Sequence, residues 1–328
     1  MNQYWLNRES LSFSLNTVYA ALGISKQALH QRLNRQLKIQ SYEHQLLYLV
    51  HELREEHPAM GCRDMYHLLQ PECMGRDAFE WFCKANGFSV ERKINYCRTT
   101  DSSGVVRFKN LTVNLVLNRL NQVWVSDITY FYAMGRFYYL TFITDAFSRK
   151  IIGYNVSKRL FTESTSLAAL EMAFKDRKGV DLRGTIFHSD GGGQYYADGF
   201  LKKTAEKGMV NSMCEYPWEN GKAERVNGII KNNYLRHRSI HSDDDLYREL
   251  DRSVLLYNEK KPHKALNKVT PVNFELAYIR NGKTSESDES TTDNAIRPGM
   301  ASKPFDADGK TSFGSDITQD YATKSNVK

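Results

Sequence analysis

Cysteine is scarce in this chain of 328 residues. The five cysteines form no Cys-x-x-Cys pair, and their odd number argues against a disulfide framework. A zinc site is the alternative use for them, and its candidate ligands lie close together in the sequence: His51, His57, Cys62, His67 and Cys73. Their spacing does not fit a zinc module, and Cys62 falls where helix periodicity predicts burial. We therefore expect no zinc there.

Long apolar runs are also missing. No stretch approaches the roughly 20 apolar residues that cross a bilayer, and residues 1–8 lack the apolar region of a signal peptide. These absences argue against a membrane protein and a secreted protein. The sequence predicts a cytoplasmic protein.

Acidic residues are outnumbered, and the charge is unevenly placed. The net charge is +7, and residues 281–328 hold six Lys/Arg against eight Asp/Glu, so the first 280 residues carry +9. A basic body suits a polyanionic partner, although charge alone is weak evidence. Residues 281–328 also contain few large apolar side chains, so we expect a disordered tail that cannot offset its ordering entropy.

Three acidic residues stand in distinctive local sequences. Asp127 lies inside an apolar, β-prone run, Asp190 ends a second such run, and Glu224 opens a helix-like stretch. A carboxylate in a hydrophobic strand is costly unless it is paired or bound to metal. Three carboxylates brought together would repel one another and hold protons unless a divalent cation neutralised them. This is the logic of a two-metal phosphodiester site.

The strings around these residues resemble a known family. Residues 121–275 resemble the integrase catalytic core of bacterial transposases of the insertion-sequence-three family, which shares its Asp-Asp-Glu triad with retroviral integrases. The matching strings are residues 121–130 (NQVWVSDITY), 144–153 (TDAFSRKIIG), 188–195 (HSDGGGQY) and 220–228 (NGKAERVNG), followed by Tyr257-Asn258, His263, Leu266 and Thr270-Pro271. The resemblance implies that Asp127, Asp190 and Glu224 are the catalytic, metal-binding residues.

The chain departs from the family pattern at two points. Only 33 residues separate Asp190 from Glu224, slightly fewer than is usual, and Gly191 stands where the family commonly has Arg. Glu219 and Glu215 are therefore alternative third carboxylates. We favour Glu224 because it lies inside the matched string and on a periodic helix, whereas Glu219 follows Pro217-Trp218 in a predicted loop.

Residues 1–40 are expected to form a DNA-binding helix-turn-helix. Asn16 can cap a first helix that Gly23 ends, and Ser25 starts a second helix over residues 25–36. An ordinary helical hairpin is the alternative. The outer face of the second helix carries residue types that contact phosphates and base edges: Lys26, Gln27, His30, Gln31, Arg32 and Arg35.

The remaining domains follow in order. Residues 41–90 should form a second helical, helix-turn-helix-like unit, and residues 91–120 a basic linker containing Arg92, Lys93, Arg98, Arg107 and Lys109. Residues 121–280 should form the core, with strands near 123–131, 137–144, 150–156, 184–189 and 209–213. The predicted fold is multidomain: all-α at the N-terminus, then an α/β (α+β) ribonuclease-H-like integrase core.

The resemblance also implies a function. It predicts a DNA transposase that binds the terminal inverted repeats of a mobile element and cleaves and joins strands with two Mg²⁺ (or Mn²⁺) ions. In the family a basic residue seven positions after the Glu contacts DNA, and here that residue is Lys231. Its partners would be double-stranded DNA, as element ends and target, and further copies of itself; bound to DNA, it would associate with the nucleoid. The alternatives are a structure-specific ribonuclease-H-like nuclease and a non-catalytic DNA-binding regulator derived from a transposase.

Overall fold

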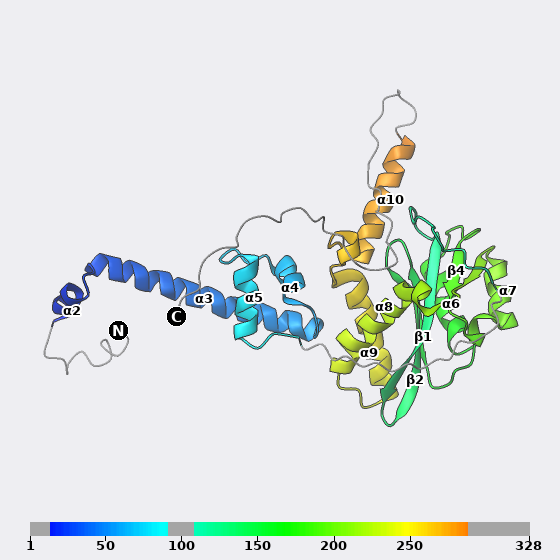
Figure 1. Cartoon of the computed structure of the whole chain (residues 1–328), viewed down its shortest axis with the longest axis horizontal. Coiled ribbons are helices and arrows are strands. Elements are labelled where there is room, and N and C mark those ends of the chain that lie inside the picture. Colours follow the sequence, from blue (N-terminus) through cyan, green and yellow to red (C-terminus); the bar gives the residue numbers. More distant parts are fainter. Residues whose placement is uncertain (1–13, 91–107, 288–328) are drawn as a thin grey trace, which may run out of the picture. The chain divides into compact units, whose positions relative to one another are not determined.

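The computed structural model describes residues 14–90 and 108–287. The first range is entirely helical, and Figure 1 shows its elements along the blue and cyan part of the chain. Its helices are α2 (Leu15–Ala21), α3 (Lys26–Glu56), α4 (Cys62–Leu69) and α5 (Arg76–Ala85). The expected helices at the N-terminus are confirmed.

Helix α2 begins one residue after Ser14, whose hydroxyl accepts from the Thr17 amide N–H, so the cap is Ser14 and the predicted Asn16 cap is wrong. The turn to α3 passes through Gly23, whose φ of 63° a side chain would disfavour. Ser25 then caps α3 as predicted, accepting from the Ala28 amide N–H.

Helix α3 is continuous over 31 residues and crosses the boundary predicted between residues 40 and 41. Nothing in residues 37–45 interrupts it, because this stretch contains neither proline nor glycine. The two predicted helical units therefore share one helix. Its second half packs against α4 and α5 around a small core of its own, formed by Leu46, Val50, Met60, Met65, Phe79, Phe82, Cys83 and Phe88.

The second range is an α/β domain. Its strands are β1 (Val123–Ala133), β2 (Arg136–Asp145), β3 (Ile151–Ser157), β4 (Ile186–Ser189) and β5 (Val210–Met213). They form one mixed sheet in the order β3-β2-β1-β4-β5. Strands β1, β2 and β3 pair antiparallel, whereas β4 pairs parallel with β1 and with β5. The α/β core with a mixed sheet is confirmed, and its strands lie close to the predicted ranges.

Helices cover both faces of this sheet (Figure 1). They are α6 (Ser166–Asp176), α7 (Asp198–Glu206), α8 (Gly221–Ile229) and α9 (Asp243–Leu255); a further helix, α10 (Pro271–Ser287), follows α9 in the chain. Alternate residues of a strand face opposite sides, so Phe142 packs with side chains of α8 and α9, while the adjacent Ile143 packs with those of α6 and α7. None of the helices in the described ranges is long and apolar enough to span a membrane.

Three details refine the predicted boundaries. Helix α8 ends at Ile229 and continues as a π-helical turn over Ile230–Tyr234. Helix α10 runs to Ser287, so the predicted tail boundary at residue 281 falls inside a helix. Of the predicted linker, residues 108–120 lie beside the sheet, where the Leu111 amide N–H donates to the Ser212 hydroxyl. The rest of the linker and of the tail lies outside the described residues.

Candidate active site

The first predicted carboxylate, Asp127, lies in the middle of β1, opposite Phe142 of β2. The strand around it is fixed from two sides. The neighbouring Ser126 is fully buried, its hydroxyl donating to the Phe142 carbonyl and lying 2.9 Å from the Tyr195 hydroxyl. Because β1 is hydrogen-bonded to β2 and to β4, the Asp127 backbone sits on a rigid central strand.

The second carboxylate, Asp190, directly follows β4. Since β4 runs parallel to β1, with Ser189 opposite Ser126, the chain leaves β4 beside Asp127. The Asp190 carboxylate accepts from the Gly192 amide N–H at 3.2 Å, and the Tyr196 hydroxyl donates to its backbone carbonyl at 2.9 Å. The Gly191-Gly192 turn thus holds the Asp190 side chain at the end of β4.

The third carboxylate, Glu224, lies in the first turn of α8 and is exposed. Three residues later on the same helix, the buried Asn227 donates from its side-chain amide to Asp127 Oδ2 at 2.7 Å. Residues three apart share a helix face, so Glu224 lies on the side of α8 that meets β1.

Electrostatics connect the three groups. Burial, followed by the negative charges of Asp190 and then of Glu224, raises the pKa of Asp127 to about 7. Burial raises the pKa of Asp190, against the hydrogen bond from Gly192. Partial desolvation, followed by the charge of Asp190, raises the pKa of Glu224. The negative charge of Asp190 therefore makes both Asp127 and Glu224 harder to ionise, and the charge of Glu224 adds to the effect on Asp127.

The carboxylates do not form a compact ligand set in this structure. Over residues 14–90 and 108–287, no group of three or more His, Cys, Asp or Glu side chains is placed to hold a metal ion. The metal-binding role of Asp127, Asp190 and Glu224 thus stays a prediction.

Of the two alternative third carboxylates, Glu215 lies in the loop after β5, and Glu219 lies in a short 3-10 helix over Pro217–Asn220, where a loop was predicted. The Glu219 carboxylate already makes two hydrogen bonds: its Oε2 accepts from the amide N–H groups of Glu215 and Tyr216, at 2.6 and 3.1 Å. This is a capping role, which favours Glu224 as the third member of the site.

The predicted DNA-contacting residues fall in two places. Lys231 lies in the π-helical turn after α8, and its ammonium group donates to the Thr129 hydroxyl at 2.7 Å and to the Tyr130 carbonyl at 3.2 Å. It therefore meets the same strand as Asp127. The other residues are all exposed on the first half of α3: Lys26, Gln27, His30, Gln31, Arg32 and Arg35.

A buried polar network lies at the start of β1, and the sequence analysis did not predict it. The buried Arg177 donates to both carboxylate oxygens of the buried Glu275 and to the Asn121 side chain, next to the start of the strand. The carboxylate of Asp145, opposite Trp124, accepts from the Asn121 amide N–H. Asp145 lies in the matched string 144–153, whereas no local sequence pattern marks Arg177 or Glu275.

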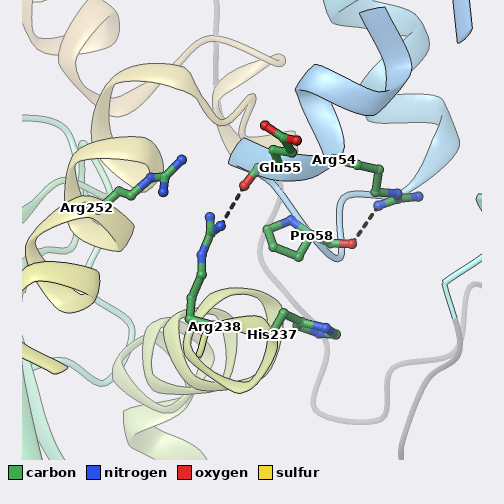
Figure 2. A pocket seen from close by; sticks show the side chains of 6 residues that line it. All are labelled: Arg54, Glu55, Pro58, His237, Arg238 and Arg252. Carbon is green, nitrogen blue, oxygen red and sulfur yellow. Dashed lines mark hydrogen bonds between the residues drawn. The ribbon is translucent and has the colours of Figure 1, made fainter. Parts of the chain in front are cut away.

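A pocket of about 550 Å³ lies elsewhere in the molecule (Figure 2). Its lining is strongly basic and includes Arg54, Glu55, Pro58, His237, Arg238 and Arg252. Two of the arginines are already used: Arg54 donates to the Pro58 carbonyl and Arg238 to the Glu55 carbonyl. None of the predicted site residues lines it, so the pocket is separate from the carboxylates.

The chain is similar to known proteins over the part that forms the sheet and its helices. Residues 118–216 and 210–271 match two families that are both described as an integrase core domain. The chain is 33% identical over 164 residues to a protein named as a transposase of insertion sequence element IS986/IS6110 from Mycobacterium tuberculosis, which covers 48% of this chain and 59% of that protein. It is 29% identical over 167 residues to transposase InsF of insertion sequence IS3A from Escherichia coli. This match covers 47% of this chain and 54% of that protein.

The chain thus spans less than two thirds of these relatives' own length. Among solved structures, it is similar to the HTLV-2 integrase catalytic core domain in complex with magnesium, with 21% identity and a TM-score of 0.37, covering 47% of this chain and 95% of that one.

Proposed function

From the integrase core domain that this chain carries over residues 118–271, and from its kinship with transposases of the insertion-sequence-three family, we propose that it is a DNA transposase. It would bind the terminal inverted repeats of its own element, cleave phosphodiester bonds there, and join the ends to target DNA. The observation that carries the proposal is that carboxylates from β1, from the end of β4 and from α8 come near enough for the charges of Asp190 and Glu224 to raise the pKa of Asp127, and for the charge of Asp190 to raise that of Glu224.

The residues at this site suit a divalent cation. Carboxylate oxygens are the ligands that Mg²⁺ and Mn²⁺ favour, and the buried Asn227 Oδ1 beside Asp127 has no hydrogen-bond partner among the described residues. Asp127, Asp190 and Glu224 would hold two ions. When bound, such ions supply activation of a water or 3′-hydroxyl nucleophile and stabilisation of the leaving oxygen.

The protein's own residues would orient the reacting groups. Hydrogen bonds from the Ile128 backbone and from the Asn227 amide stabilise the ionised form of Asp127 against the two neighbouring charges. The Lys231 ammonium, held by Thr129 and the Tyr130 carbonyl, adds positive charge on the same strand. A DNA phosphate drawn to this charge would lie beside Asp127.

The exposed first half of α3 would supply recognition of the element ends. A polar helix face that includes Arg, Lys, Gln and His offers contacts to phosphates and to base edges. Because two ends must be cut and joined together, we propose that several copies of the chain assemble on DNA.

The test is a series of single substitutions, Asp127→Asn, Asp190→Asn and Glu224→Gln, assayed on duplex DNA carrying the element's ends. Each variant should lose Mg²⁺-dependent cleavage and joining by at least roughly a hundredfold, because each removes a negatively charged ligand. DNA binding without metal should be retained. Glu219→Gln is the matched control and should keep activity, since Glu219 caps a loop.

The outcomes separate the candidate functions. Cleavage without joining would indicate a structure-specific nuclease, and specific binding without any Mg²⁺-dependent cleavage would indicate a regulator. Full activity in Glu224→Gln together with loss in Glu219→Gln would move the third carboxylate to Glu219.

A further inference from the structure

Two aromatic side chains stand together in solvent on the loop between β5 and α8. Tyr216 and Trp218 stack with their ring centroids 4.6 Å apart and their planes only 4° from parallel. Their exposed fractions are 46% and 73%. Aromatic pairs of this kind normally gain stability from burial. Here the outer faces of both rings are left largely in water, so the pair offers a flat apolar surface to a ligand.

Both ends of this loop are fixed next to the carboxylates. At its start, the Cys214 amide N–H donates to the carbonyl of Ser189, the residue before Asp190. At its end, the Asn220 side-chain amide donates to the carbonyl of Ser126, the residue before Asp127. The loop therefore spans the edge of the site, and its exposed aromatic pair lies within a few residues of both anchors.

The loop is also held from within. The Glu219 carboxylate accepts from the amide N–H groups of Glu215 and Tyr216, which ties the residue before α8 back to the start of the loop. A platform whose backbone is already ordered loses little conformational entropy when a ligand settles on it. The aromatic pair is thus arranged in advance of binding.

We propose that Tyr216 and Trp218 form a stacking site for an unpaired nucleobase at the DNA end that the carboxylates process. This inference rests on the proposed function. Every base presents a flat π-face once it leaves the duplex stack, so an exposed aromatic ring binds it without regard to sequence. Within a duplex that face is covered by the neighbouring base pairs, so the site favours single-stranded or frayed ends. Holding the terminal base would fix the adjoining phosphodiester against the carboxylates.

The experiment uses the full chain and two DNA probes: a blunt duplex and the same duplex with a short single-stranded 3′ end carrying 2-aminopurine. Binding is measured without divalent metal, so that cleavage cannot interfere. The unpaired end should bind more tightly than the blunt end, with quenching of the 2-aminopurine fluorescence. In Trp218→Ala this preference should fall roughly tenfold or more, as expected for loss of one stacked base. Trp218→Phe, which keeps a ring, should restore most of it.

Trp81 provides a matched control. It has the same 73% exposure but lies on α5, in the helical region. Trp81→Ala should leave both the preference and the fluorescence unchanged. Melting temperatures of all variants should equal that of the unsubstituted protein, because neither indole is buried.

The competing explanations predict different results. If Trp218→Ala keeps the preference, or Trp81→Ala loses it equally, the stacking site is overturned. If Trp218→Ala instead weakens self-association in sedimentation without changing DNA binding, the pair is a contact between copies. The proposed function is read separately, from Mg²⁺-dependent cleavage by the unsubstituted protein, so its failure would not be mistaken for failure of the stacking site.

Discussion

Strand β1 carries the first predicted catalytic carboxylate, Asp127, and the first half of α3 carries most of the predicted DNA-contacting residues; the two elements are built in opposite ways. Strand β1 is hydrogen-bonded on both edges, and of its first four residues none exceeds 4% exposure. Over residues 26–40 of α3, only Leu29 is buried. The predicted catalytic carboxylate therefore depends on tertiary packing for its position, whereas the predicted DNA-contacting residues need only an exposed helix.

Because of this difference in burial, substitutions in the two elements should affect activity and stability in different ways. A substitution near β1 perturbs packing as well as chemistry, so its effect on activity must be corrected for unfolding. A substitution on the outer face of α3 changes what the surface offers to DNA and leaves the core alone.

The largest effect on stability is expected from the buried ion pair of Arg177 and Glu275. Replacing Glu275 by Leu leaves a buried guanidinium without its main partner, which should lower the free energy of unfolding by about 3–5 kcal/mol. Chemical denaturation measures this directly. The control is the exposed pair of Arg183 and Asp181, where Asp181→Asn should cause no measurable change. Equal effects at the two pairs would show that the buried network is not structural.

The next effect is a pH dependence from a buried histidine in the core. Burial, followed by the charge of Lys261, lowers the pKa of His263 to about 4. Between pH 6.5 and 4 the unfolded chain binds a proton here that the folded chain does not, so stability falls as the pH falls. The loss should approach about 3 kcal/mol near pH 4. His263→Gln should reduce the slope of unfolding free energy against pH over this window by the share of one histidine, while the buried His57 and His188, whose pKa values burial also lowers to about 4, keep theirs. An unchanged slope would contradict the assignment.

A smaller loss of stability is expected when a side chain is added where β3 packs against α6. A Cβ added at Gly153 would lie 2.9 Å from the Ala173 amide nitrogen and closer still to the Ala169 carbonyl oxygen. Backbone cannot move aside cheaply, so Gly153→Ala should destabilise the protein by about 1–3 kcal/mol. Gly61→Ala is the control, since nothing lies within 4 Å of the added Cβ there. A melting temperature for Gly153→Ala equal to that of the control would show that α6 shifts freely on the sheet.

The same contrast explains what could be predicted from the sequence. The strands of the core and the cap at Ser25 follow from local patterns, and they are confirmed. The continuity of α3 past residue 40 was missed, because the absence of a stop signal is weaker evidence than its presence. The pairing of Arg177 with Glu275, 98 positions apart, leaves no local trace, because it follows from how α6 and α10 meet. The prediction of Glu224 rests on its matched string, whereas the effect of its charge on Asp127 follows only from the fold.

The recognition residues on α3 should show the smallest effect on stability and a clear effect on binding. Phosphate contacts supply affinity that salt weakens, whereas contacts to base edges separate one sequence from another. Replacing Lys26, Arg32 and Arg35 together by Ala should weaken binding to every duplex and reduce the slope of log affinity against log salt by roughly 0.9 for each phosphate that the variant no longer neutralises. Replacing Gln27, His30 and Gln31 together by Ala should instead abolish the preference for element ends over a scrambled duplex at fixed salt. Lys38→Ala, exposed on the same helix beyond residue 36, is the control. If the second triple variant keeps its preference, recognition of the ends lies within residues 41–120 and the exposed half of α3 is structural.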